Sequence, residues 1–506
     1  MEVKDYIVGI DIGSSSVVMA VGSRNDDDTV SVAGVDVQEI EGCVKDGVII
    51  NFMELGNAIS RAKRALEGEL GLKLNSAYVG ISGRSVYCVR YEDYVDVRNK
   101  TGFVTENEVR ELHSRIEMVV SGGGDDIVDR IPLRYRINDN QEVSNPIGSY
   151  GRKLSATYLF VLAGKQQVDF VSRALYHADM KLSGLCVNPT LLPSVLLSEA
   201  EMEDGVAIVD IGSDLTDVSV VKEGKLWYFS SLPIGASSIN DDLNEFLRTS
   251  KRNIDPLKRK YGSAIASLVP ADVTVPVKTA GNAKKQILQR NIAEIAEERL
   301  KDIAGFVKRE LKASKFISKI PGGVVLTGGS AYLQNIDQLF ARELEMDVRL
   351  GITINGIDEE SQGKISAFPQ AVVMGLLCYG AKHSACETTP TEQPKNTPAD
   401  TPREDKGTEV DIFGGVGGND VPNGNGGVVP TDEPEHPTPN PGENKTKDEA
   451  PQGGIAPTGG TPEKGEQQEE QKTDDKKSNP KGGKKLGWLE RFRGWVDDAF
   501  NSDEYI

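Results

Sequence analysis

The chain has 506 residues, which at roughly 100–200 residues per domain predicts two or three domains. Its formal net charge is −19, with 77 acidic against 58 basic residues, so its surface repels phosphate backbones and no nucleic-acid partner is expected. The 5 cysteines form no C-x-x-C pair, so their spacing predicts neither a zinc site nor a disulfide framework. The acidic N-terminus and the lack of a run of ~18 apolar residues predict neither export nor a membrane-spanning helix.

Short apolar runs alternate with helical patterns through residues 1–386, as an α/β fold requires. The clearest predicted strands are Tyr6–Ile12, Val17–Gly22, Ala77–Ser82, Ala156–Leu162, Val206–Ile211, Val218–Lys222 and Val324–Thr327. The predicted helices are Phe52–Gly68, Val168–Ala178, Lys284–Leu311 and Leu333–Glu345. A capping-box pattern from Thr105 to Glu108 predicts another helix start.

The first strand leads into a small polar turn. Asp11 stands near the end of the strand, and Gly13, Ser14 and Ser15 follow it. Such a turn offers backbone N–H groups and hydroxyls that suit a phosphate without side-chain bulk. Taken alone, the motif also fits a plain hairpin with a tight glycine turn.

The same order of residue types returns two hundred residues later, where Asp210 stands near the end of a predicted strand. The turn and its flank contain Gly212, Ser213, Asp214 and Thr216. This repetition predicts two related halves that face a common site. Asp11 and Asp210 would then hold Mg²⁺ through its waters, because Mg²⁺ binds few carboxylates and keeps much of its hydration.

A third glycine cluster follows the strand Val324–Thr327 and precedes a predicted helix. It contains Gly328, Gly329 and Ser330. Glycines let the backbone approach a base or ribose closely, and a helix N-terminus favours anionic groups. Together with the two hairpins, this cluster predicts a nucleotide site, although the sequence contains neither a Walker loop nor G-x-G-x-x-G.

These three segments, in this order, resemble the phosphate-1, phosphate-2 and adenosine motifs of the actin, Hsp70 and sugar-kinase superfamily. Within it, the chain resembles the FtsA family of bacterial cell-division proteins over residues 5–386 and at its C-terminal tip. The segments 77–84, 135–140 and 145–154 carry the likeness beyond the glycine turns. The resemblance implies an α/β, actin-like two-lobed ATPase fold with an inserted α+β subdomain, and ATP with Mg²⁺ as cofactors.

The resemblance also assigns residues. Asp255 and Lys258 match an acidic-x-x-Lys element that closes over adenosine and ribose. Asn188 stands where the superfamily often places a water-positioning residue, and an amide can orient water but is no general base. The second turn departs from the family's glycine-rich run, because Asp214 would repel phosphates unless Mg²⁺ or solvent intervenes. We therefore expect at most a slow ATPase.

The predicted domain boundaries follow from this assignment. The first lobe comprises residues 1–83 and 164–200, with the inserted subdomain at 84–163. The second lobe comprises 201–231 and 305–386, with an outer subdomain at 232–304. Residues 387–485 hold 14 of the 24 prolines and a single aromatic, which predicts a disordered acidic linker. Residues 486–506 form the predicted terminal helix.

The terminal segment has helical periodicity, with an apolar stripe within an arc of about 140°. The stripe contains Trp488, Leu489, Phe492, Trp495, Val496 and Phe500. Because a long linker separates it from any core and Lys and Arg flank it, the stripe suits a bilayer interface. Packing on the parent domain and binding in a groove of a partner protein remain alternatives.

By resemblance, the protein self-associates into filaments and binds the C-terminal peptide of the tubulin-like division protein FtsZ, along with other division proteins. It would tie FtsZ to the cytoplasmic face of the inner membrane at the division site. Alternatives on the same fold are a small-molecule kinase and a pilus-assembly ATPase. A chaperone of Hsp70 type would need a β-rich domain that residues 387–485 do not predict.

Overall fold

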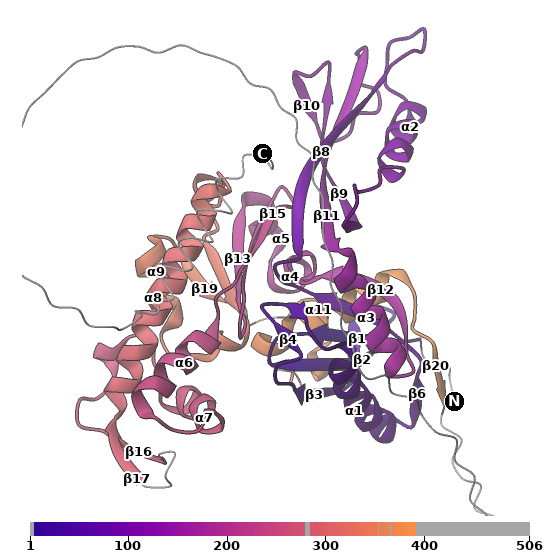
Figure 1. Ribbon diagram of the computed structural model, residues 1–506. Helices are drawn as coiled ribbons and strands as arrows, with labels where there is room; N and C mark the ends of the chain where they lie inside the picture. The colour runs from indigo at the N-terminus through magenta and orange to yellow at the C-terminus, as the bar shows by residue number, and fades with distance from the viewer. Residues whose placement is uncertain (1–4, 279–283, 353, 364, 366, 391–506) are drawn as a thin grey trace, which may run out of the picture. The chain divides into compact units, whose positions relative to one another are not determined.

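The computed structural model describes residues 5–278, 284–352, 354–363, 365 and 367–390, and two five-stranded sheets form the frame of this part of the chain (Figure 1). The predicted linker from residue 391 onward and the predicted helix from Trp488 to Phe500 lie outside these ranges. Within them, no helix is both long enough and apolar enough to cross a bilayer.

The first sheet has the strand order β12-β7-β1-β2-β3. Its strands are β1 (Tyr6–Ile12), β2 (Ser16–Arg24), β3 (Val30–Glu39), β7 (Ser76–Ile81) and β12 (Lys181–Val187). β1, β2 and β3 form an antiparallel meander, whereas β7 is parallel to both β1 and β12. Almost every residue of β1, β2 and β7 is buried, the pattern of strands covered on both faces.

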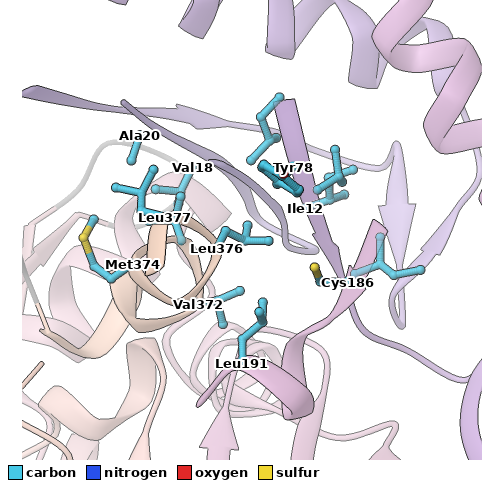
Figure 2. Close-up of a cluster of buried hydrophobic side chains, with 14 of the residues drawn as sticks. Ile12, Val18, Ala20, Tyr78, Cys186, Leu191, Val372, Met374, Leu376 and Leu377 are labelled. Atoms are coloured by element: carbon cyan, nitrogen blue, oxygen red, sulfur yellow. The ribbon is translucent and has the colours of Figure 1, made fainter. Parts of the chain in front are cut away.

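Helices supply that cover. α1 (Phe52–Leu70) packs on β2 and β3, and it begins where the Asn51 side chain accepts hydrogen bonds from two backbone N–H groups of its first turn. It ends at Gly71, whose φ of 66° closes the helix. α3 (Lys165–His177) packs against α1, and α11 (Ala367–His383) packs against β1, β2 and β7. Figure 2 shows apolar side chains of α11 and of these strands in one buried cluster.

The second sheet repeats this topology with the order β19-β18-β13-β14-β15. Its strands are β13 (Val206–Ile211), β14 (Thr216–Lys222), β15 (Lys225–Leu232), β18 (Val324–Thr327) and β19 (Val348–Leu350). β13, β14 and β15 form the antiparallel meander, and β18 is parallel to β13 and to β19. The predicted duplication is therefore confirmed, and three predicted strands, β1, β13 and β18, have the predicted bounds.

An inserted subdomain follows β7. Its sheet has the order β10-β9-β11-β8, and α2 packs on β8 and β11. These elements are β8 (Val86–Asp96), α2 (Glu106–Glu117), β9 (Asp125–Ile137), β10 (Gln141–Val143) and β11 (Lys153–Gly164). The predicted capping box is present. The Thr105 side chain accepts a hydrogen bond from the backbone of the first turn of α2, and the Glu108 side chain accepts one from the backbone N–H of Thr105. The subdomain has its own apolar core, which includes Leu112, Ile116 and Leu154.

The predicted helix Lys284–Leu311 is wrong in its first five residues. They form the strand β17 (Lys284–Leu288), which pairs antiparallel with β16 (Thr274–Lys278), and helix α8 (Gln289–Ala313) begins only after it. Ile287 is the one buried residue of β17 and lies opposite Val275, so the local pattern is that of a hairpin. The apolar residues Leu288 and Ile292 extend the helical periodicity by chance across this boundary.

The remaining elements connect these parts. They are β4 (Val44–Lys45), β5 (Val48–Ile49), β6 (Leu72–Leu74), α4 (Asn188–Leu196), α5 (Glu199–Asp204), α6 (Ala236–Leu247), α7 (Lys251–Tyr261), η1 (Ala266–Leu268), η2 (Ile317–Lys319), η3 (Gly329–Tyr332), α9 (Ile336–Leu344), α10 (Glu359–Gln362) and β20 (Thr388–Pro390). β20 pairs with β6, so the sheet pairing continues past the predicted linker start at residue 387.

Candidate functional site

The two acidic hairpins have the same geometry. Ile12 pairs with Val17 across the first and Ile211 with Thr216 across the second, so four residues form each turn. The N–H of Gly13 donates to the carbonyl of Ser16 over 3.0 Å, and the corresponding bond in the second turn measures 2.9 Å. Gly13, Ser14, Ser213 and Asp214 are partly exposed, as residues that receive a ligand must be.

Asp11 and Asp210 lie next to the last residues of β1 and β13. Burial raises the pKa of Asp11 to about 7, a hydrogen bond from Asn188 opposes this rise, and the charge of Asp217 adds to it. Burial also raises the pKa of Asp210 well above its usual range, with smaller contributions from Asp217 and Asp11. The structure thus brings the two predicted carboxyls into electrostatic range of each other.

Asn188 joins this pair from the start of α4. Its side-chain amide donates a hydrogen bond of 3.1 Å to the Asp11 carboxylate, and the residue is 7% exposed. The strand β12 ends at Val187, and its parallel pairing with β7 places Asn188 beside the C-terminal end of β1. The expected water-positioning residue therefore lies at the candidate site.

The third glycine cluster lies against the second hairpin. Gly328 has a φ of 88°, and a Cβ atom there would stand 2.3 Å from Oδ1 of Asp210. Only glycine therefore permits this approach. Gly329 has open space at its Cβ position, whereas Ser330 is buried. β18 delivers the cluster, because it pairs in parallel with β13 and sets Thr327 beside Asp210.

Lys258 is linked to the second hairpin by way of Ala236, the first residue of α6. Lys258 is buried and forms an ion pair of 2.9 Å with Asp255 one turn earlier on α7. Its Nζ also lies 3.5 Å from the carbonyl of Ala236, and the N–H of Ala236 donates to the carbonyl of Gly212. Burial lowers the pKa of Lys258. The acidic-x-x-Lys element thus lies one residue away from the second turn.

Thr216, predicted as a ligand-binding residue, has a hydrogen-bond partner inside the protein. It is fully buried, and its hydroxyl donates a hydrogen bond of 2.7 Å to the carbonyl of Ile234. The bond fastens β14 to the chain that enters α6. The hydroxyl therefore anchors the second hairpin, and a ligand-binding role for Thr216 stays a prediction.

Asp214 contacts the other half of the molecule. Its carboxylate lies 3.5 Å from the backbone N–H of Asp46, in the turn between β4 and β5, and 3.3 Å from the hydroxyl of Ser213. Burial raises the pKa of Asp46, and the charge of Asp214 adds to the rise. The acid that departs from the family's glycine-rich turn is therefore used in a contact between the first and second halves.

Asp217 was not assigned a role from the sequence. It is 6% exposed, and its carboxylate accepts hydrogen bonds of 2.5 Å from the hydroxyls of Ser82 and Ser231. The spacing of the two acids along the chain could have indicated their contact, because across a four-residue turn residues 210 and 217 become cross-strand partners. Finding it required the length of the turn, which the sequence alone did not fix.

Several buried polar atoms around the hairpins have no hydrogen-bond partner in the described part of the chain. They are Asn188 Oδ1, Thr327 Oγ1 and Ser330 Oγ. An unsatisfied buried polar group costs about 1–3 kcal/mol, so such groups mark places where a ligand or water completes the structure. The residues present fit a polar ligand with phosphates and a divalent cation.

Comparisons with known proteins agree on one family. A family model described as "Cell division protein FtsA" matches residues 207–367, and one described as "SHS2 domain inserted in FTSA" matches residues 83–162. The cell division protein FtsA of Pseudomonas aeruginosa is 27% identical over 377 residues, which cover 74% of this chain and 89% of that protein. The FtsA of Bacillus subtilis is 28% identical over 351 residues, covering 69% and 79%.

Among solved structures, the chain resembles one described as "PilM-PilN type IV pilus biogenesis complex". The TM-score is 0.51 at 16% sequence identity, with 74% of this chain and 98% of that chain covered. At this identity the likeness concerns the fold. It agrees with the duplicated sheets described above and with an actin-like architecture.

Proposed function

Because the chain belongs to the FtsA family of cell-division proteins, with an actin-like fold and an inserted SHS2-type subdomain, we propose that it binds ATP and Mg²⁺ and tethers FtsZ to the cytoplasmic membrane. The observation that carries the nucleotide part is the meeting of Asp11, Asp210 and the Gly328 cluster. Unpartnered buried polar atoms surround the same point.

The nucleotide would lie among three segments of this chain. The N–H groups and hydroxyls of the two turns, with Ser14, Ser15 and Ser213, would bind phosphate oxygens. Asp11 and Asp210 would hold a hydrated Mg²⁺, which neutralises charge on the phosphates. Gly328 and Gly329 would approach the adenosine, with Lys258 on the side of α6. We propose at most slow hydrolysis, because Asn188 can orient water but cannot accept its proton.

The membrane part rests on the terminal stripe from Trp488 to Phe500. A face of Trp, Leu and Phe buries well at the acyl boundary, while Asp497 and Asp498 weaken attraction to anionic lipids. Binding by one helix would therefore be modest and would depend on apolar insertion. Many helices on one filament would multiply it into firm attachment at the cytoplasmic face of the division site.

The partners follow from the family. The outer subdomain at residues 232–304 would bind the C-terminal peptide of FtsZ, and copies of this chain would associate into filaments with other division proteins nearby. ATP bound to both halves would stabilise the arrangement that polymerises.

Liposome flotation tests this function. The full chain and a version that ends at Lys485 would be mixed with vesicles, with and without ATP and Mg²⁺. We expect the full chain to float, to a greater extent with ATP, and the shortened chain to stay in the dense fraction. Equal flotation of both proteins would contradict the proposed membrane tether. Incubation with ATP and a panel of sugars tests the kinase alternative, and phosphorylated sugar would favour it.

A further inference from the structure

The strand β15 connects the second hairpin to the inserted subdomain. It is the edge strand of the second sheet, it lies against β8 and β9, and one of its ends pairs with Thr216, the first residue after the second turn. Near that end, the hydroxyls of Ser82 and Ser231 lie 3.2 Å apart. Farther along, the thiol of Cys88 donates to the carbonyl of Phe229 over 3.4 Å. A series of contacts with the first half therefore runs along β15 away from the candidate nucleotide site.

Trp227 lies at the far end of this series and contacts two arginines of the inserted subdomain. The Cζ atoms of Arg90, on β8, and Arg134, on β9, lie 6.0 Å and 5.9 Å from the centre of its ring. The ring of Phe316 lies 6.0 Å from that of Trp227 and 5.4 Å from Arg90. The indole N–H donates to the carbonyl of Lys222 over 2.9 Å, which fixes the direction of the ring. Cations at such distances are attracted by aromatic rings, so Trp227, Phe316, Arg90 and Arg134 form a clasp between the inserted subdomain and the second half.

Chain connectivity does not require this clasp. The inserted subdomain is joined covalently to the first half alone, because β8 follows β7 and β11 leads into α3. Its further contact with β15 is a hydrogen bond of 2.7 Å from Lys225 to the carbonyl of Leu133. Cation–π contacts at partly exposed sites and single hydrogen bonds are modest interactions. Such a clasp can therefore shift an equilibrium between two arrangements of the halves without fixing it.

We propose that the Trp227 clasp couples nucleotide binding to the position of the inserted subdomain, by favouring the arrangement in which both hairpins reach one nucleotide. The inference rests on the proposed nucleotide site. In the structure the clasp is formed while Asp11 and Asp210 lie within electrostatic range of each other. A nucleotide that contacts both halves favours this same arrangement. By linkage, the clasp then tightens nucleotide binding and the nucleotide strengthens the clasp by the same factor.

Calorimetry with ATP and Mg²⁺ on the full chain tests the coupling. Trp227→Leu keeps an apolar side chain but removes the ring, so it should weaken ATP binding about fivefold as fewer molecules hold the binding arrangement. Arg90→Met keeps the stem and removes the charge, and should weaken binding about twofold. Because both changes remove the same contact, the double variant should bind little more weakly than Trp227→Leu alone. Loss equal to the product of the two single effects would contradict a shared contact.

Two further variants separate this role from a merely structural one. Trp227→Phe keeps an aromatic ring and should retain most of the affinity, and an equal loss in Trp227→Phe and Trp227→Leu would overturn the proposal. Arg98→Met is the matched control, because Arg98 is exposed and pairs with Asp96 inside the inserted subdomain. It should bind ATP as the wild type does. Arg90 is exposed, so Arg90→Met carries the prediction if Trp227→Leu does not fold.

The reverse effect can be measured on the wild type by hydrogen exchange. ATP with Mg²⁺ should slow exchange in the segments 86–96 and 225–232 by about twofold or more. Unchanged exchange in both segments at saturating ATP would contradict the coupling.

The outcome for the wild type also separates the two proposals. Wild type that does not bind ATP would remove the nucleotide site and the role of the clasp with it. Wild type that binds ATP with the same affinity as Trp227→Leu and Arg90→Met would remove only the role of the clasp.

Discussion

The side-chain amide of Asn188 donates a hydrogen bond of 3.1 Å to the carboxylate of Asp11, which joins the start of α4 to the end of β1. The same residue presents a buried carbonyl oxygen without a partner in the described structure. Asn188 thus fixes the direction of the Asp11 carboxylate and keeps one acceptor for a ligand or water. It occupies this place because β12 and β1 both run parallel to β7.

Asn188→Ala should weaken ATP binding in Mg²⁺ about fivefold. The loss of one hydrogen bond to a carboxylate is worth about 1 kcal/mol, and Asp11 would also lose its fixed direction. Calorimetry with ATP and Mg²⁺ measures the change. Asn57→Ala, an exposed amide on α1, is the control and should bind as the wild type does. Equal affinity of both variants would contradict the role given to Asn188.

Gly328→Ala should damage the site, and Gly329→Ala should be tolerated. A Cβ at position 328 meets Asp210 Oδ1 at 2.3 Å and must adopt a φ of 88°, whereas a Cβ at 329 meets nothing within 4 Å. The strain alone costs about 1–3 kcal/mol. Thermal unfolding and ATP binding should both weaken in the first variant only. Similar behaviour of the two variants would show that the close approach is unimportant.

The ion pair between Glu201 and Arg349 should make stability depend on pH. Hydrogen bonds from Arg349 lower the pKa of Glu201 to about 2, from an ordinary 4.5. A carboxyl whose pKa is lowered by folding stabilises the folded state at pH values above its pKa in the unfolded state. This contribution is lost as the pH falls from about 4.5 towards 2.

Glu201→Gln should therefore lower the free energy of unfolding at pH 7 by about 1 kcal/mol, since the pair is partly exposed. The difference from the wild type should shrink as the pH falls below 4.5. Urea unfolding at several pH values between 7 and 3.5 measures it. A constant difference at all pH values would mean that the ion pair is not its cause.

Phe492→Asp should abolish flotation of the full chain on vesicles. Burial of one Phe side chain contributes about 1.5–3 kcal/mol to membrane binding, whereas insertion of a carboxylate into the bilayer interface is unfavourable. Asp498→Asn, on the opposite face of the expected helix, should float at least as well as the wild type. The fraction of protein recovered with the vesicles gives the result. Loss of flotation in both variants would argue against an oriented apolar face.

The duplicated fold could be predicted because its signals are local. A buried strand followed by Asp and Gly occurs at Asp11 and again at Asp210, and both hairpins form as expected. The hydrogen bond of Thr216 could not be predicted, because its partner, the carbonyl of Ile234, lies eighteen residues away. Asp217 was missed because its contact with Ser82 spans 135 residues and both halves.

Local periodicity also misled at one boundary. Residues 284–288 continue the apolar spacing of α8, yet they form β17 because Ile287 pairs across the hairpin with Val275. The pairing of β16 with β17 is a tertiary contact that helical spacing does not encode. Helix existence was therefore predicted correctly, while its start was not.

A crystal structure of the chain with a non-hydrolysable ATP analogue and Mg²⁺ tests the central claim most directly. We expect the triphosphate between the turns at residues 13–16 and 212–215, with the metal's waters on Asp11 and Asp210 and the adenosine beside Gly328. Nucleotide bound at another surface, with these two carboxylates in contact with neither metal nor phosphate, would contradict it.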